Sequence, residues 1–316
     1  MNTNDINMNK SLLELLIRRA LLDSMEWITK RCHSAPQEPD YVAALSTKFT
    51  ESMYHILRAV FPAVNFSITG VYCHQKPIVD INMCKNPELG DLLLVYVDRD
   101  CNGNRMMNSL LLQVKISNFV QKKISSSELH QLELYKRWPE FTYLRAGKLN
   151  GEKRNIQPKT INDGAQYLLI DNDPLTNVFL EEPNMFPMRC AIPDSILKID
   201  DSFSNEIVNF LKFKAGRTVD SEYYATNDDW SKMIWELLFI TRAICTRRKN
   251  AGITAMPRDN TFVNFCTQNM KGHSLFDEMD FYNDDIRNIE EIGGVSVILI
   301  ESINNQREEF DERNLR

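Results

Sequence analysis

Three polar residues stand within or beside two otherwise apolar stretches of the chain. Asp91 precedes the run 92–97, and Gln113 and Lys115 lie two residues apart in the run 110–116. Side chains two apart in a strand point to the same face, so Gln113 and Lys115 are expected side by side. A carboxylate and an amide oxygen can hold Mg²⁺, which activates a water for attack on a phosphodiester. A nearby lysine can orient that water and offset the negative charge that develops. The alternative is that Asp91 caps a turn and the other two lie on a solvated edge.

The elements that must position these residues can be read from the flanking sequence. Residues 98–104 include Asn102-Gly103, a step suited to reversing the chain, so the two apolar runs are predicted to form a hairpin. Ser125 and Glu128 have the spacing of a capping box, which predicts a helix that runs to about Trp138. The apolar run 165–170 predicts a further buried strand.

The N-terminal part of the chain is predicted to be largely helical. Helical periodicity covers residues 12–28, and a second helix is predicted over 40–61, where it carries Glu51. Short strands are expected at 65–71 and 78–81. Together with the hairpin, the helix and the late strand, these elements predict a mixed α/β core.

Length and composition place the chain among ordinary folded proteins, with 316 residues, 43% hydrophobic and 25% charged. We expect an N-terminal helical extension at 1–40, a core at 41–175 and a C-terminal α+β region of unknown role at 176–316. That last region is either a helical cap or a small second domain. It includes a predicted helix at 228–248 and an apolar run at 293–300, predicted to be a strand.

Several functional classes find no support in the sequence. It contains no long apolar run, no secretory cleavage pattern, no P-loop and no Gly-x-Ser-x-Gly elbow, so we expect a cytoplasmic protein without a membrane span. The seven cysteines are widely scattered, which argues against a zinc site or a disulfide framework.

The net charge of −6 conceals a basic segment. Residues 105–159 hold eleven Lys and Arg against four Glu, a balance that can attract a polyanion. The residues that we expect to bind nucleic acid in this segment are Lys122, Lys123, Lys136 and Arg137.

The stretch 87–91, Pro-Glu-Leu-Gly-Asp, followed by Gln113-Val-Lys115, resembles the PD-(D/E)XK nucleases, which include restriction and genome-defence enzymes. The resemblance covers residues 45–171 and implies a restriction-endonuclease-like fold: a helix, a three-strand meander, a helix and a strand, with helices on both faces of a mixed sheet. It also implies that Asp91 binds metal, that Gln113 occupies the usual acidic position and that Lys115 is the catalytic lysine. Glu51 is the candidate for a glutamate that some members add from the preceding helix.

The chain departs from that family in two places. Its proline and aspartate are not adjacent, and glutamine replaces an acid at 113, which removes one negative charge that would attract a metal. The helix after Lys115 carries Gln131 and Tyr135 one turn apart, which resembles the helix that these nucleases place beside the site; packing is the alternative.

The expected function is therefore a Mg²⁺-dependent endodeoxyribonuclease, with Mn²⁺ as the alternative metal, that acts in bacterial defence against phage or foreign DNA. RNA is the alternative substrate. The expected binding partners besides nucleic acid are a second copy of the chain, in a homodimer, or a partner protein of a defence system. A catalytically inactive nuclease-fold protein that binds nucleic acid or a partner protein is the competing hypothesis. A third is an interaction module that docks a partner through the helix 228–248 and its Trp230.

Overall fold

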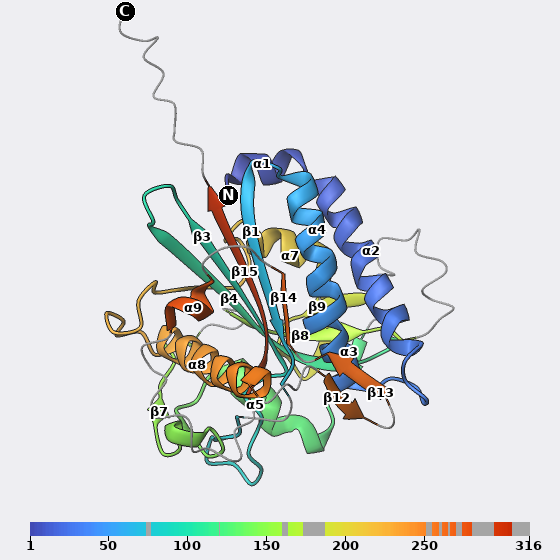
Figure 1. The fold of residues 1–316 in the computed structure, drawn as a ribbon. Coiled ribbons are helices and arrows are strands. Elements are labelled where there is room, and N and C mark those ends of the chain that lie inside the picture. The colour runs from blue at the N-terminus through green and yellow to red at the C-terminus, as the bar shows by residue number, and fades with distance from the viewer. Residues whose placement is uncertain are drawn as a thin grey trace, which may run out of the picture.

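Among its described residues, the computed structural model has a ten-stranded mixed sheet covered by helices (Figure 1). This confirms the expected α/β class. Nine strands follow one another across the sheet in the order β14 (Cys266–Asn269), β1 (Val64–Val71), β15 (Ser296–Asn304), β3 (Leu92–Arg99), β4 (Arg105–Ile116), β8 (Ala165–Ile170), β9 (Met188–Ala191), β10 (Ile196–Ser202) and β5 (Gln121–Lys123). The structure describes residues 1–73, 77–119, 121–159, 164–172, 187–250, 255–258, 261–264, 266–269, 274–279 and 294–304.

The predicted hairpin is formed by β3 and β4, which pair antiparallel from Leu92 opposite Leu112 to Arg99 opposite Arg105. Its turn is closed by the Asp100 side chain, whose Oδ1 accepts from the Asn102 and Asn104 backbone N–H groups at 2.9 and 2.8 Å. Gly103 has φ +83°, a conformation that glycine adopts without strain. Because the strands are antiparallel, the start of β3 lies beside the end of β4.

The chain returns from β4 to β8 through the predicted helix. A 3₁₀ turn over Ser126–Glu128 leads into α5 (Leu129–Arg137), and the Ser125–Glu128 capping box is present. β8 then pairs parallel to β4, from Leu111 opposite Ala165 to Ile116 opposite Ile170. A helix between two parallel strands is the usual crossover connection, so this part of the fold follows directly from the sequence pattern.

The helix predicted over 40–61 begins earlier and is interrupted. α3 (Glu38–Ala44) continues into a π-helical segment, Leu45–Phe49, and then into α4 (Thr50–Val60). This segment packs directly on β1, because a Cβ atom built at Gly70 would lie 1.9 Å from the Ser46 carbonyl oxygen. Glycine at position 70 therefore permits the helix backbone to approach the sheet.

The three-strand meander implied by the resemblance is not formed, because a strand from the far end of the chain lies within it. β15 lies between β1 and β3, antiparallel to β1 and parallel to β3 over eight residue pairs each. The strands β9, β10 and β15, all from the region 176–316, thus belong to the same sheet as the strands of 41–175.

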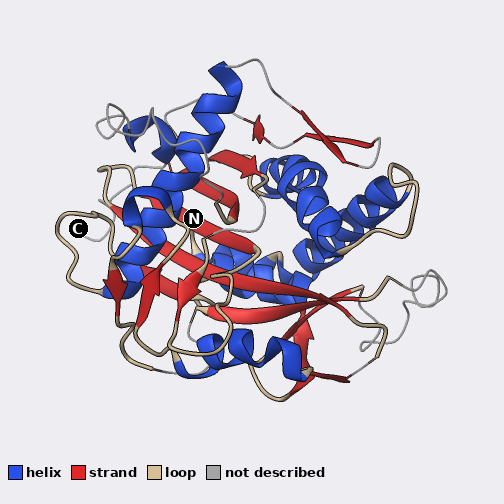
Figure 2. Ribbon diagram, turned by 90° about the horizontal axis from the view of Figure 1, so that it is seen from below, coloured by secondary structure: helices blue, strands red, loops and turns tan. Residues whose placement is uncertain are grey.

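Helices lie on both faces of the sheet, as Figures 1 and 2 show from two directions, and an apolar layer packs against each face. Alternate residues of β3 separate the two layers: Leu92 and Leu94 face the layer of α2 (Lys10–Thr29), α3, α4 and α7 (Phe203–Leu211). Leu93 and Val95 face the layer of α5 and α8 (Asp229–Asn250). A strand buried on both faces is apolar throughout, which explains the uninterrupted run at 92–97.

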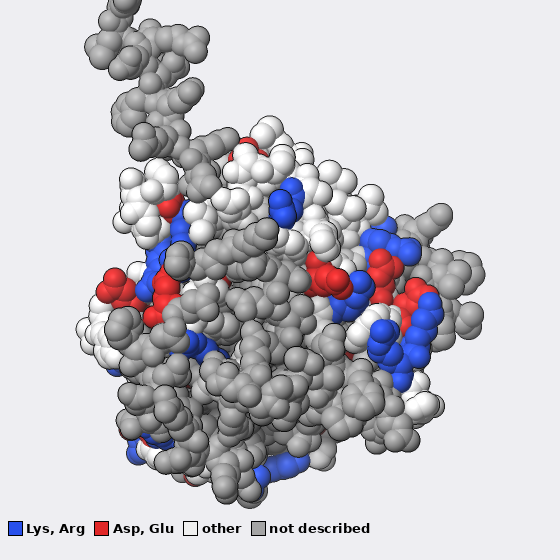
Figure 3. Space-filling model, in the orientation of Figure 1, with Lys and Arg blue, Asp and Glu red and all other residues white. Residues whose placement is uncertain are grey.

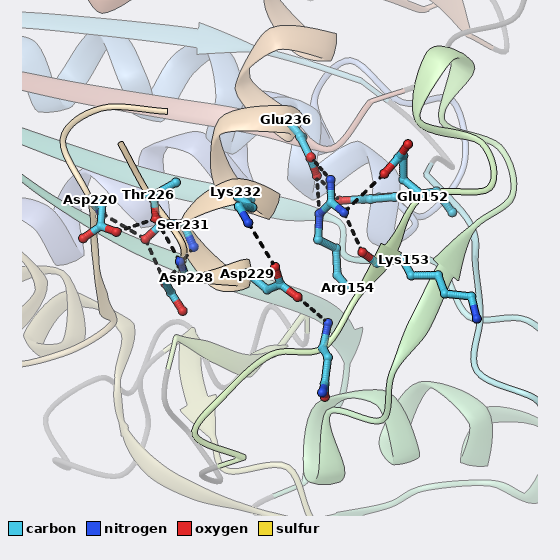
Figure 4. Close-up of polar contacts among 12 residues, drawn as sticks. Glu152, Lys153, Arg154, Asp220, Thr226, Asp228, Asp229, Ser231, Lys232 and Glu236 are labelled. Carbon is cyan, nitrogen blue, oxygen red and sulfur yellow. Dashed lines mark hydrogen bonds and ion pairs between the residues drawn. The ribbon is translucent and has the colours of Figure 1, made fainter. Parts of the chain in front are cut away.

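The long helix α8 is fixed by buried polar contacts (Figure 4). Glu236 accepts from Arg154 of β7 (Lys153–Arg154), with Nε to Oε2 at 3.2 Å, and from the Tyr143 hydroxyl at 3.1 Å. Trp230 and Trp235 are buried in the core. The aromatic residues of this helix therefore pack internally, which removes the basis for a docking surface at Trp230.

The remaining elements are small. α1 (Thr3–Met8) precedes α2, and β11 (Arg217–Val219) pairs with β4. β2 (Val79–Asp80) and β6 (Phe141–Tyr143) form a three-stranded sheet with β7, and β12 (Ala255–Arg258) pairs with β13 (Thr261–Asn264) in a hairpin. The 3₁₀ turn Gly147–Leu149 and α9 (Leu275–Glu278) complete the set.

Candidate active site

Asp91 is anchored to the neighbouring strand through both its backbone and its carboxylate. Its backbone N–H donates to the Leu112 carbonyl at 3.0 Å, and its Oδ2 accepts from the Val114 N–H at 2.7 Å. The same Oδ2 also accepts from Nε2 of Gln113. The antiparallel register that sets Leu92 opposite Leu112 therefore brings two of the predicted site residues into direct contact.

Gln113 is only 6% exposed, and one end of its amide is unsatisfied. Its nitrogen donates to Asp91, whereas its Oε1 is buried without a hydrogen-bond partner among the described residues. A buried polar atom without a partner is uncommon in folded proteins. The amide oxygen is thus an available ligand beside a carboxylate.

The pKa of the Asp91 carboxyl group is raised. Burial raises its pKa to about 7, and the nearby Glu88 carboxylate acts in the same direction, although the Val114 hydrogen bond and Lys115 oppose the change. Burial likewise raises the pKa of Glu88 above its ordinary value, with Lys115 opposing. A bound cation would favour the ionised form of both carboxylates.

Lys115 lies two residues beyond Gln113, and its side chain is 13% exposed. Its Nζ lies 2.9 Å from Glu128 Oε1 and 3.6 Å from Glu38 Oε2. Burial acts to lower the pKa of Lys115, but Glu38 and Glu128 outweigh it and the net change is upward. The ammonium group is therefore charged at neutral pH. The structure brings Gln113 into contact with Asp91 and places Lys115 two residues farther along the same strand, β4, on the face that strand periodicity predicts for Gln113 and Lys115.

The structure does not bring Glu51 to this group. Its exposed carboxylate pairs with Lys48 at 3.0 Å on the solvent side of α4. The glutamate that reaches Lys115 from the N-terminal helices is Glu38, whose Oε1 also accepts from the Ile116 N–H at 3.2 Å. Sequence reasoning missed Glu38 because it lies at the helix start, within a segment that reads as a proline-rich break.

The residues expected to bind nucleic acid do not form a free basic cluster. Lys136 pairs with Asp194 at 2.7 Å, Arg137 pairs with Glu133 at 3.1 Å, and Lys122 donates to the Ile116 carbonyl at 3.1 Å. Lys123 is exposed on β5. On the face drawn in Figure 3, the described basic and acidic side chains are interspersed. Acidic partners, Asp194 from outside the segment among them, thus offset part of the positive charge of residues 105–159.

The helix after Lys115 lies over the same face of the sheet. Gln131 is buried, and its Nε2 has no hydrogen-bond partner among the described residues. Tyr135 is fully buried, and its hydroxyl donates to the Leu89 carbonyl at 3.0 Å. Tyr135 thus ties α5 to the loop that leads into Asp91.

Two hollows adjoin these residues. One pocket has a volume of about 480 Å³ and is lined by Glu38, Pro39, Ile116 and Asn172, together with residues 35–37. A second, smaller hollow is lined by Asp91, Gly90 and Pro39 among others. Pro39, in the first turn of α3, borders both hollows.

The oxygen donors at the site fit a hard divalent cation with few protein ligands. Among the described residues, no three His, Cys, Asp or Glu side chains are grouped as a metal site. The available donors are the Asp91 carboxylate and the unpartnered Gln113 Oε1. Mg²⁺ is commonly bound by one or two protein oxygens and keeps several waters, so this pair is a suitable set.

Comparisons with family models, with curated proteins and with solved structures gave no match to this chain. Among the described helices, none has both the length and the apolar composition needed to cross a membrane.

Proposed function

We propose that the protein is a metal-dependent nuclease that hydrolyses phosphodiester bonds of DNA. One observation carries the proposal: Gln113 joins Asp91 through its amide nitrogen, keeps a buried oxygen that no described residue partners, and lies two residues from a charged lysine. This combination of an acid, an oxygen ligand and a lysine supports phosphodiester chemistry better than any other described group of residues. A role in bacterial defence against phage or foreign DNA accompanies the proposal through the family resemblance alone.

The chain's own residues have distinct tasks in this reaction. Mg²⁺ or Mn²⁺ held by Asp91 and Gln113 would polarise the phosphate and lower the pKa of a water. Lys115 offsets the negative charge that develops on the phosphate oxygens. The water oxygen forms the new bond to phosphorus and loses a proton, while one bridging P–O bond breaks and the leaving oxygen gains a proton.

The direct test is cleavage of supercoiled plasmid, single-stranded DNA and RNA by the purified full chain, with Mg²⁺, Mn²⁺ or EDTA. We expect cutting of DNA that EDTA abolishes and that Lys115→Met reduces about 100-fold or more, because the charge that stabilises the transition state is lost. Lys30→Met is the matched control, since Lys30, just beyond the end of α2, forms an exposed pair with Glu26 at 2.5 Å. Equal cutting by the wild type and Lys115→Met would contradict the assignment of Lys115.

A second candidate is an inactive nuclease-fold protein that binds nucleic acid or a partner protein. The observation that favours it is the engagement of Lys115 by Glu128 and Glu38, which must release the ammonium before it can face a phosphate. DNA binding by both wild type and Lys115→Met, with no cleavage under any metal condition, would support this candidate over the first.

A further inference from the structure

Tyr167 is a buried tyrosine whose hydroxyl has no hydrogen-bond partner among the described residues. It lies on β8 directly opposite Gln113 of β4, and its side chain is fully buried. Opposite residues on neighbouring strands point to the same face of a sheet, so Tyr167 and Gln113 share the face covered by α5. Two unpartnered polar atoms, a hydroxyl and an amide oxygen, therefore occur on paired residues.

The surroundings of Tyr167 belong to the candidate site. Its ring lies 5.8 Å from the ring of Tyr135 on α5. Burial raises the pKa of Tyr167, and the carboxylates of Glu128 and Asp91 raise it further. Glu128 is the residue that holds Lys115, and Asp91 is the residue that holds Gln113.

The contrast with another buried tyrosine makes the unpaired hydroxyl informative. Tyr143 is also fully buried, but its hydroxyl donates to Glu236 at 3.1 Å. A buried hydroxyl without a partner destabilises a fold, and phenylalanine would fill the same space without that cost. Such a hydroxyl is therefore a candidate to form a hydrogen bond when the site binds its metal.

We propose that Tyr167 is a positioning residue for Gln113: in the metal-bound site its hydroxyl donates to Gln113 Oε1, directly or through one water. An amide oxygen has two lone pairs, so Oε1 can accept this bond and still bind a cation. A donor on the oxygen side also selects the amide orientation in which Nε2 faces Asp91, as observed. Such hydrogen bonds to metal ligands fix their orientation and affinity. The inference rests on the proposed nuclease function.

The test measures Mg²⁺ affinity by calorimetry on the metal-free full chain, together with thermal unfolding. We expect Tyr167→Phe to weaken Mg²⁺ binding about 10-fold or more, the usual effect of losing such a partner. Its Tm without metal should stay at or above that of the wild type, because no existing hydrogen bond is lost. Tyr143→Phe is the matched control, which should lower Tm and leave Mg²⁺ affinity unchanged.

A double variant tests whether Tyr167 acts through Gln113. If it does, Tyr167→Phe combined with Gln113→Ala should bind Mg²⁺ as weakly as Gln113→Ala alone, because the two changes remove one interaction. A wild type that binds Mg²⁺ and cuts DNA, with a Tyr167→Phe variant of equal affinity, would overturn this inference and leave the proposed function intact. A wild type that neither binds Mg²⁺ nor cuts would overturn both.

Discussion

At the scale of a single residue, Asp91 affects both the proposed reaction and the stability of the fold. Burial raises the pKa of its carboxyl group to about 7 from an ordinary value of 3.8. A folded-state pKa above the unfolded one means that the native state binds the proton more tightly. Stability therefore falls as pH rises from about 4 to about 7, and it is lowest above 7, where the partly buried carboxylate is charged. The site thus holds a charge that the fold alone would not favour.

We therefore expect Asp91→Asn to abolish Mg²⁺-dependent cleavage while raising Tm by a few degrees at pH 8. The gain should be smaller at pH 5, where the wild-type carboxyl is mostly protonated in the folded protein. Differential scanning calorimetry of the metal-free proteins at both pH values measures this. Asp194→Asn serves as a control, since Lys136 holds the pKa of that exposed carboxyl below its ordinary value, and it should give no gain. A lower Tm for Asp91→Asn at pH 8 would contradict the argument.

Strand periodicity predicts that Gln113 and Lys115 share a face, because a period of two fixes which side chains lie together. The contact of Asp91 with Gln113 depends in addition on the register of the predicted hairpin. Periodicity could not predict Glu38, which reaches Lys115 from 77 positions earlier in the chain. Nor could it show that Glu51 faces solvent, since the π-helical segment before α4 changes the rotation of everything that follows it. Contacts made between elements depend on packing that no local pattern contains.

At the scale of elements, the start of α5 is coupled to Lys115. Glu128 closes the capping box with Ser125 and also binds Lys115. One carboxylate therefore both caps the start of a helix and holds Lys115. Although burial opposes the change, the Ser125 hydroxyl and Lys115 lower the pKa of Glu128 to about 2. The sequence showed the capping box, but not that its acid would reach a neighbouring strand.

Glu128→Gln should therefore destabilise the protein by about 1 kcal/mol at pH 7, the usual effect of losing a cap and a partly exposed ion pair. A depressed carboxyl pKa gives stability that is present above the unfolded value of 4.5 and is lost as pH falls toward 2. The difference between variant and wild type should thus be smaller at pH 3, as measured by urea unfolding. Glu133→Gln, which removes an exposed pair with Arg137 on the same helix, should change stability less. An equal loss at both pH values would show that the charge is not responsible.

At the scale of the whole molecule, the last described strand of the chain, β15, lies inside the main sheet. β15 joins β1 to β3, and its alternate residues enter both apolar layers, with Val297 and Leu299 on one face and Ile298 and Ile300 on the other. Its Ser296 N–H also donates to the Asp91 carbonyl at 3.3 Å. The part of the chain that carries the candidate site residues therefore depends on the C-terminal region for the strand that joins β1 to β3.

We accordingly expect a fragment of residues 41–175, which contains Asp91, Gln113 and Lys115, not to fold alone. Without β15, β1 and β3 lose eight paired residues each and the apolar faces of both strands are exposed. Circular dichroism and heteronuclear NMR spectra of the fragment should show no cooperative unfolding and poor dispersion. A chain that ends at residue 304 is the control, because it keeps every described strand and should unfold in one transition like the full chain. Cooperative unfolding of the 41–175 fragment would mean that the sheet tolerates the loss of the strand between β1 and β3, and that the site can be assembled without the C-terminal region.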